Sequence, residues 1–429
     1  MSVNILSNAK IYIKKTSQSR FVKNLSITFA ENVITKIFGF FITLALVRNL
    51  GPENYGIYSF VLINIFLLSN LFDFGMENTA IRFANRDKGK TNPVFGLYFI
   101  TKSIILLICI LIVALGGKNI LEFMHKPELI KYLPYFLIGF IGESLFFVND
   151  TYLQCLQKFK LRAVINILRY ITMFCFMLVL ILNKLLLLKY VMFLFIIPII
   201  FSLFFIPRYW TFISSFFKQK LSKKLMLEMF HYEKWMFVLA SVNGLLGRVD
   251  IYMLSFWATY AQLGIYSAAY NLLSIVSFLP YVLGKVMLPK MAETSREELF
   301  DMTIKIVKPI LAISLLSLIV IPIFPFLVPI LFGHKYDSSI IIVQILTIVT
   351  LMSFILLPFE QSMYPLGKPK YTSAIKFAQL ILNIILNFIF IPKYGMIWAA
   401  INLVFARLFY GILLIKVFYN EKQKEIINE

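Results

Sequence analysis

The chain has 429 residues, of which 60% are hydrophobic and 16% aromatic, and its mean hydropathy is +0.82. So much apolar surface excludes a water-soluble globular protein of this size. The formal net charge of +21 would suit a nucleic-acid-binding protein, but the distribution of Lys and Arg along the chain argues against that class.

The apolar residues form long runs separated by short polar stretches. Each run is long enough to cross roughly 30 Å of hydrocarbon as a helix, whereas a membrane β-barrel would show short alternating segments. The sequence therefore predicts an all-α polytopic membrane protein. We expect twelve transmembrane helices, at residues 25–47, 57–76, 94–115, 132–151, 163–182, 186–206, 234–257, 264–287, 308–330, 339–358, 372–391 and 396–418.

Most of the Lys and Arg residues fall in the N-terminal tail, in the connections after even-numbered spans and in the C-terminal tail. By the positive-inside rule this distribution places both termini in the cytoplasm. We predict a cytoplasmic tail (1–24), a first lobe (25–206), a cytoplasmic amphipathic linker (207–233), a second lobe (234–418) and a cytoplasmic tail (419–429). The linker is either a helix lying in the membrane interface or a solvated basic loop.

A short repeat relates the two predicted lobes. The sequence Gly-Ile-Tyr-Ser occurs at residues 56–59 and again at 264–267, and each copy opens the second span of its lobe. Because each lobe has an even number of spans, both lobes enter the membrane from the same side and the repeat is parallel. We therefore expect two pseudo-symmetric six-helix lobes around a central cavity, with the substrate handled between them.

Polar and charged side chains inside the spans are the candidate functional residues, because hydrocarbon disfavours them and they face a protein interior or a wet cavity. The first span of each lobe carries a polar stripe. The candidate substrate-binding residues are Lys36, Arg248, Asn32, Asn243, Lys102, Arg169 and Arg407. Their excess of positive charge favours an anionic substrate, and phosphate or diphosphate is the natural match. For any single charge, pairing with a neighbouring helix is an equal alternative.

Fewer acidic residues lie at comparable depth in the spans. Glu31, Glu143 and Asp250 are the candidates for exchanging a coupling ion, either a proton or sodium. The three histidines lie far apart in predicted loops, and the three cysteines lack the spacing of metal ligands. The sequence therefore predicts no metal site, no cofactor and no catalytic residue.

Two elements near the N-terminus resemble the polysaccharide-biosynthesis flippases, the Wzx-type branch of the MOP superfamily. Residues 48–56 read RNLGPENYG, which matches the family's R-x-L-G-P-x-x-Y-G element between spans 1 and 2. Residues 71–75 read LFDFG, which matches its D-x-G element at the end of span 2. On this basis we assign structural roles to Gly51, Pro52, Gly56, Asp73 and Gly75, and through the repeat to Gly264.

The resemblance implies a MATE-like fold and an inner-membrane flippase rather than an enzyme. Such a protein would move a polyprenyl-diphosphate-linked oligosaccharide repeat unit from the cytoplasmic to the outer leaflet by alternating access. The end product would be a surface polysaccharide such as O-antigen lipopolysaccharide, capsule or exopolysaccharide. The implied partners are the lipid-linked oligosaccharide, membrane lipids, and the polymerase and chain-length proteins of the pathway, with no nucleic acid.

Three other classes stay open at this level. A MATE-type ion-coupled exporter of small molecules or drugs has the same number of spans, but it relies on buried acids for cationic drugs, whereas this interior is net basic. A membrane enzyme such as a polysaccharide polymerase would usually carry a large outer loop, and the predicted outer loops here are short. A scaffold without a transport role is the third alternative.

Overall fold

The computed structural model describes residues 2–86, 91–218, 223–277 and 279–428. Side chains are described from residue 23 onward except at some helical positions, and the predicted site residue Asn243 is one of these exceptions. Residues 219–222 of the predicted linker lie outside the described part, and so do nearly all side chains of the predicted tail 1–24.

The described residues are almost entirely helical, with no strand among them. In chain order the elements are α1 (Ser2–Leu71), α2 (Met76–Arg86), α3 (Thr91–Phe123), η2 (Pro127–Tyr132), α4 (Leu133–Cys155), α5 (Phe159–Leu182), α6 (Leu188–Val191), η3 (Met192–Ile196), α7 (Ile197–Leu203), α8 (Ile206–Lys218), α9 (Lys223–Leu246), α10 (Val249–Trp257), α11 (Tyr260–Ser277), α12 (Leu279–Ala292), α13 (Arg296–Ser317), η4 (Leu318–Ile323), α14 (Phe324–Phe332), η5 (His334–Tyr336), α15 (Ser339–Ser362), α16 (Pro369–Tyr394) and α17 (Met396–Asn428).

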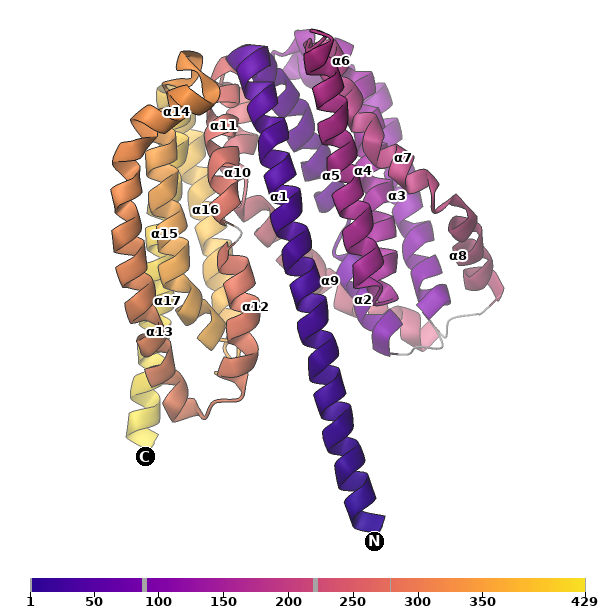
Figure 1. Cartoon of the computed structure of the whole chain (residues 1–429), viewed down its shortest axis with the longest axis vertical. Coiled ribbons are helices and arrows are strands. Elements are labelled where there is room, and N and C mark those ends of the chain that lie inside the picture. Colours follow the sequence, from indigo (N-terminus) through magenta and orange to yellow (C-terminus); the bar gives the residue numbers. More distant parts are fainter. Residues whose placement is uncertain (1, 87–90, 219–222, 278, 429) are drawn as a thin grey trace.

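The helices form two bundles, and both ends of the chain lie on the same side of the molecule (Figure 1). We call that side the terminal side and the opposite one the far side. The first bundle consists of α1–α8 and the second of α10–α17. Helix α9 connects them, because it contacts α1 and α2 in the first bundle and α16 in the second. This architecture agrees with the predicted polytopic all-helical fold.

Helix α1 contains two traversals because the chain reverses at Gly51, where φ is 71° and ψ is 171°. Lys36 and Phe66, on opposite sides of this turn, line the same cavity. A straight helix would hold them roughly 45 Å apart. Pro52 begins the returning limb, a position where the missing N–H removes no helical hydrogen bond. The Gly51-Pro52 element therefore builds the turn between the first two predicted spans.

The number of unbroken spanning helices is smaller than the number of predicted spans. By length and hydropathy, seven helices among the described residues are able to cross a membrane, and the first of these holds both limbs of α1. There are up to eight if the pair Leu188–Leu203 and Pro207–Ser215, bent by 51°, is one span.

Two predicted spans are divided into shorter helices. The span 234–257 is interrupted between α9 and α10, whereas 264–287 is helical on both sides of residue 278, which lies outside the described part. The span 308–330 is split among α13, η4 and α14, where Pro322 and Pro325 remove backbone donors. Interrupted helices are tolerated at membrane depth where neighbouring helices or a wet cavity satisfy the backbone.

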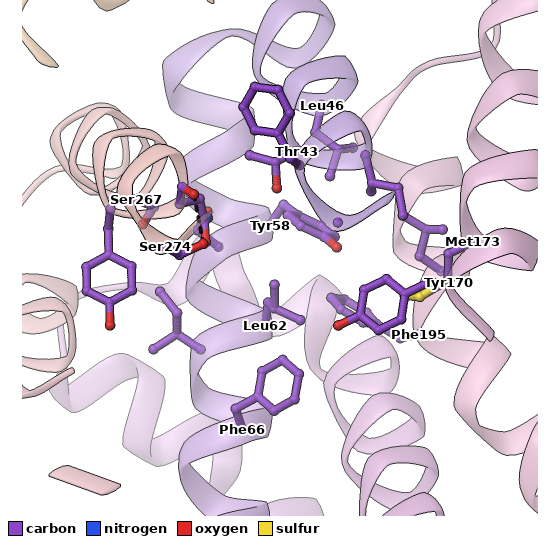
Figure 2. Close-up of a pocket in the computed structure, with 18 of the residues that line it drawn as sticks. Thr43, Leu46, Tyr58, Leu62, Phe66, Tyr170, Met173, Phe195, Ser267 and Ser274 are labelled. Atoms are coloured by element: carbon purple, nitrogen blue, oxygen red, sulfur yellow. Dashed lines mark hydrogen bonds between the residues drawn. The ribbon is translucent and has the colours of Figure 1, made fainter. Parts of the chain in front are cut away.

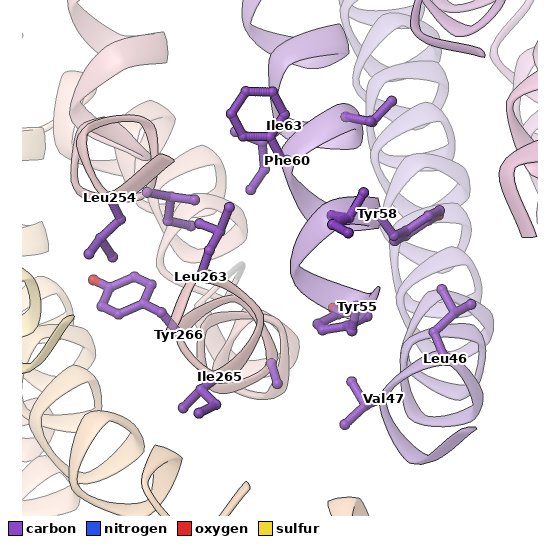
Figure 3. Close-up of a cluster of buried hydrophobic side chains, with 14 of the residues drawn as sticks. Leu46, Val47, Tyr55, Tyr58, Phe60, Ile63, Leu254, Leu263, Ile265 and Tyr266 are labelled. Carbon is purple, nitrogen blue, oxygen red and sulfur yellow. The ribbon is translucent and has the colours of Figure 1, made fainter. Parts of the chain in front are cut away.

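The two copies of the repeat meet where the bundles touch on the far side. Gly56 lies in the returning limb of α1 and Gly264 in α11. A β-carbon at Gly56 would lie 1.8 Å from the carbonyl oxygen of Tyr260, and one at Gly264 would lie 2.0 Å from that of Pro52. The backbones approach this closely only because both residues lack a side chain. Figure 3 shows the apolar packing around this contact, with Tyr55 and Tyr266 contributed by the two bundles.

The Asp73–Gly75 element ends the returning limb of α1. Phe74 and Gly75 both have positive φ, at 52° and 77°. The Asp73 carboxylate accepts a hydrogen bond of 3.1 Å from the amide of Glu77, in the first turn of α2. This bond satisfies one of the free N–H groups in the first turn of α2, so the element has a clear local role in turning the chain.

Residues 207–218 of the predicted linker are helical. Helix α8 packs against α3: the ring of Tyr209 stacks on Phe99 at 4.9 Å, and its hydroxyl donates to Asn149 Oδ1 at 3.0 Å. Trp210 and Phe217 are largely exposed. The helix therefore has one face docked on the bundle and carries large apolar side chains that are exposed.

Candidate functional site

Two adjoining cavities lie between the bundles. The large chamber, of about 890 Å³, is lined mainly by α11, α12, α15, α16 and α17, with Ser353, Glu360, Lys376, Gln379 and Arg407 among its residues. The small chamber, of about 210 Å³, is lined by α1, α4, α5, α7 and α11, with Thr43, Tyr58, Glu143, Arg169 and Tyr170 among its residues. Figure 2 shows the small chamber, with side chains from both bundles facing a common space.

Five residues line both chambers and mark the junction between them: Lys36, Arg248, Tyr270, Asn271 and Ser274. Arg248 lies at the break between α9 and α10, with non-helical dihedral angles. The hydroxyl of Tyr270 donates to the Gly247 carbonyl at 2.8 Å, which satisfies part of the opened backbone. The helix break therefore places the Arg248 guanidinium at the centre of the site.

The junction cations have no carboxylate partner among the described residues. Neither Lys36 nor Arg248 belongs to any ion pair found there, and the two charges interact unfavourably with each other. Arg248 lies over the rings of Phe66 and Tyr270, each 5.8 Å away, and it interacts with the Asp250 carboxylate without forming an ion pair. Two adjacent cations facing a cavity produce a positive potential that attracts an anion.

The large chamber carries a further cluster of charge. Lys376 and Glu360 form an ion pair, and the hydroxyl of Tyr410 also donates to Glu360, at 3.0 Å. Arg407 donates to the Ser353 hydroxyl at 2.6 Å and belongs to no ion pair within the described part of the chain. Over both chambers, the lining holds five basic side chains and two carboxylates, so the cavity wall is net positive.

The structure separates the predicted cations into two groups. Lys36, Arg169, Arg248 and Arg407 line the chambers. Lys102 does not: it is buried inside the first bundle, where its ammonium lies 2.9 Å from the Asp73 carboxylate. Arg169 lines the small chamber but is neutralised by Glu143. Pairing with an acid on another helix thus removes two cations from the excess that the sequence suggests.

The two predicted amides contribute differently. Asn32 donates its side-chain amide to the carbonyl of Thr28, one turn back in α1, at 2.7 Å, and it lines neither chamber. Asn243 lies in α9, and its side chain is outside the described part. The polar stripe of the first span therefore reaches the cavity through Lys36, together with Gly39 and Thr43.

The three predicted acids lie in separate environments. Glu31 accepts from Arg162 at 3.1 Å and from Asn166 at 2.7 Å, away from both chambers. Glu143 pairs with Arg169 in the small chamber. Asp250 is fully buried in the first turn of α10, with one oxygen bonded by the hydroxyl of Tyr266 and the other without a partner among the described groups.

Sequence reasoning missed several lining residues. Lys376 lies within the predicted span 372–391, so its charge was a usable signal. Glu360 lies two residues past the end of the predicted span 339–358, so the sequence does not single it out as an intramembrane charge. Tyr270 and Asn271 carried no signal, since a Tyr or Asn in a Tyr-rich membrane protein has no distinctive pattern. Only the fold brings Tyr270 and Asn271 to the junction of the chambers.

Comparison with known proteins identifies this architecture. The model of the family described as "Polysaccharide biosynthesis protein" matches residues 21–295. No curated protein matches the chain. Similar solved structures include the lipid II flippase MurJ in an inward closed conformation (TM-score 0.69, 16% identity, 95% of this chain and 91% of that one).

Two further structures are multidrug resistance MATE family transporters of the MOP superfamily. The inward-facing one has a TM-score of 0.70 at 13% identity, covering 91% of this chain and 96% of that one. The outward-facing one has a TM-score of 0.62 at 14% identity, and the match covers 94% of this chain and 95% of that one. These similarities show a common fold, in line with the MATE-like fold expected from the sequence.

Proposed function

Because this chain belongs to the polysaccharide biosynthesis protein family, we propose that it is a flippase for a polyprenyl-diphosphate-linked oligosaccharide repeat unit. The lipid-linked unit would enter between the bundles, cross by alternating access and supply the synthesis of a surface polysaccharide. The observation that carries this proposal is the convergence of Lys36 and Arg248 at the junction of the two chambers.

A diphosphate fits this junction by charge and by hydrogen bonding. Its oxygens are acceptors only, and they match the ammonium of Lys36 and the forked guanidinium of Arg248. Arg407, which forms no ion pair within the described structure, adds positive potential from the large chamber. Lys102 has no part in this proposal, because Asp73 neutralises it away from the chambers.

The same charge balance disfavours the exporter of cationic drugs as the alternative. Such a substrate would meet two cations without ion-pair partners at the junction of the chambers, and like charges in a partly desolvated cavity repel strongly. The two lining carboxylates, Glu143 and Glu360, are each engaged by a basic side chain. An anionic head group is therefore the better match to the chamber walls.

In this proposal the terminal side faces the cytoplasm of an inner membrane, in agreement with the distribution of Lys and Arg. The bundles are then in contact on the outer side, through Gly56 and Gly264. A substrate bound at Lys36 and Arg248 would be released outward only after this contact opens, as alternating access requires.

Asp250 is the acid that we propose for ion coupling. One of its oxygens has no hydrogen-bond partner among the described groups, although the residue is fully buried. Helix α10 packs against α16 and α17, which carry the buried, hydrogen-bonded amides of Asn383, Asn387 and Asn402. A proton or a sodium ion at Asp250 would satisfy the free oxygen, whereas Glu31 and Glu143 already have basic partners.

The decisive experiment is made in cells that lack the gene. We expect a complete polyprenyl-linked oligosaccharide to accumulate on the cytoplasmic leaflet, as detected by mass spectrometry and by its protection from an external glycosidase. The wild-type gene restores surface polymer, and the double variant Lys36→Ala with Arg248→Ala does not, at equal protein level.

The matched control removes two exposed cations instead, Arg86→Ala with Lys118→Ala, and we expect full complementation. Both side chains are at least half exposed and lie outside the chambers. Normal surface polymer in the Lys36 and Arg248 double variant would overturn the diphosphate assignment. Loss of drug resistance in the deletion strain, with intact polymer, would instead favour the exporter.

A further inference from the structure

The small chamber differs in chemical character from the junction that joins it to the large chamber. Its wall carries aromatic rings from three helices, including Tyr58, Phe66 and Tyr170 (Figure 2). Tyr58 and Phe195 stack at 5.4 Å with only 5° between their planes, which holds the ring of Tyr58 in place. Aromatic faces exposed to a cavity bind apolar or weakly polarised C–H surfaces.

Apart from Lys36 and Arg248 at the junction, the two charged side chains of the small chamber neutralise each other. Glu143 and Arg169 form a buried ion pair, with exposed fractions of 4% and 6%. Within the described structure, Glu143 Oε2 and Arg169 Nε have no hydrogen-bond partner, nor does the hydroxyl of Ser267 on the opposite wall. Buried polar atoms in native proteins are nearly always satisfied, so these three atoms are spare hydrogen-bonding capacity in the wall of the chamber.

A hydroxyl group fits this pair better than a phosphate does. A hydroxyl donates to the free Glu143 oxygen and accepts from the free Arg169 N–H, and it needs no net charge in the wall. A phosphate has no proton to give to Glu143 and would be repelled by it. Hydroxyl groups next to the C–H face of a ring are the combination that a pyranose presents.

We propose that the small chamber is the subsite for a neutral sugar ring of the lipid-linked substrate. This inference rests on the flippase function proposed above and specifies how the substrate lies. Tyr170 stacks on the face of the ring, and the Glu143–Arg169 pair binds one of its hydroxyl groups. The diphosphate occupies the junction at Lys36 and Arg248, which line both chambers.

This arrangement orients the substrate along the transport path. Leu46 and Tyr55 line the small chamber close to the far-side contact of the bundles. The sugar therefore points toward the far side and the diphosphate lies behind it. When the Gly56–Gly264 contact opens, the sugar meets the aqueous phase before the diphosphate does.

The test measures the affinity of the purified full-length protein for two probes: farnesyl diphosphate, and farnesyl diphosphate bearing an N-acetylhexosamine. The key variant is the double substitution Glu143→Leu with Arg169→Met. It removes both hydrogen-bonding partners but leaves the net charge of the cavity unchanged, and replacing a buried ion pair by apolar residues preserves folding in many proteins. Tyr170→Ala removes the stacking ring, and Tyr371→Ala, on an exposed tyrosine outside the chambers, is its control.

We expect the double variant and Tyr170→Ala each to weaken binding of the sugar-bearing probe roughly tenfold or more and to leave the sugar-free probe unchanged. Lys36→Ala with Arg248→Ala weakens both probes equally. If the chamber variants affect the two probes alike, or neither of them, the sugar subsite is wrong while the flippase function stands. If the wild-type protein binds neither probe, the proposed function fails and the subsite with it.

Discussion

A β-carbon on Gly264 would lie 2.9 Å from the backbone nitrogen of Gly56, so the two glycines of the Gly-Ile-Tyr-Ser repeat meet backbone to backbone. They are 208 positions apart in the sequence, and at this contact neither residue tolerates a side chain. Equivalent positions of two parallel repeats lie at equal distances from their symmetry axis, so they meet when that axis passes between them. This contact explains why the motif occurs twice.

Adding a methyl group at this contact should force the bundles apart on the far side. In Gly56→Ala the new carbon would clash with the backbone carbonyl of Tyr260, which is unable to rotate away. Overpacking of this kind costs about 1–3 kcal/mol. We expect a cysteine introduced at Ser59, which is buried in the small chamber, to react faster with an external thiol reagent.

Gly244→Ala is the matched control for this variant, because nothing lies within 4 Å of a β-carbon at that helical position. In the Gly244→Ala protein, the cysteine at position 59 should react at the same rate as in the protein without that substitution. An equal reactivity of the Gly56→Ala and Gly244→Ala proteins would show that the far-side contact does not close the chamber.

Lys126 gives the far-side contact a pH dependence. It lies in the connection between α3 and η2, donates to the carbonyl of Ala258 at 3.1 Å and faces the ring of Tyr260 at 4.6 Å. Burial lowers the pKa of Lys126 below its usual 10.5, although Glu128 nearby opposes this change. The closed contact thus binds fewer protons than an open one, so raising the pH through the interval below 10.5 favours closure.

The measurement is the distance between spin labels at positions 118 and 335, one on each bundle, between about pH 7 and pH 10. In the wild-type protein, we expect the fraction of molecules with a short distance between the two labels to rise with pH. In Lys126→Met this fraction should not change with pH. A pH response that survives in Lys126→Met would assign the titration to another group.

Lys36 and Lys102 should respond in opposite ways to the same substitution. Lys102→Met leaves the largely buried Asp73 carboxylate without its partner, which typically costs about 3–5 kcal/mol. Lys36→Met removes a cation that only faces another cation, Arg248, so stability should stay equal or rise. Thermal unfolding in detergent compares the two, and flipping assays should show loss of transport in the stable Lys36→Met protein.

The contrast between the two lysines would fail in either of two ways. A stable Lys102→Met protein would mean that Asp73 has another partner or takes up a proton. A destabilised Lys36→Met protein would mean that Lys36 holds the fold together and is not reserved for substrate.

The turn at Gly51 should accept no other residue without strain. Its dihedral angles, φ 71° and ψ 171°, belong to a region that only glycine occupies readily. Nothing lies within 4 Å of a β-carbon there, so the cost of Gly51→Ala is backbone strain alone, about 1–3 kcal/mol.

Asn usually relieves such strain in left-handed turns, but here ψ lies far from the left-handed helical region, so Gly51→Asn should not rescue stability. Gly116→Ala, at an unobstructed helical glycine, should be neutral or slightly stabilising. A Gly51→Asn protein as stable as the wild type would show that the turn adjusts to a different conformation.

The amino-acid sequence was enough to establish the class of the protein and to predict the direction of its repeat. Apolar runs of this length indicate membrane helices, because a continuous helix bonds its backbone groups within its own segment, whereas barrel strands would alternate between apolar and polar residues. The elements around Gly51 and Asp73 likewise signalled local turns, because their backbone conformations depend on the residues themselves. The cations at Lys36 and Arg248 stood out because charge is rare inside spans.

Which charges face the chambers depends on the packing of the helices and is visible only in the folded protein. Lys102 and Lys36 are indistinguishable as single lysines in apolar spans, but Asp73 lies against one and Arg248 near the other. Ion pairs between helices depend on the rotation and register of each helix in the bundle, and side-chain spacing along one helix carries no information about its neighbours. For the same reason the Glu143–Arg169 pair, with its free hydrogen-bonding atoms, became visible only when α4 and α5 were packed together.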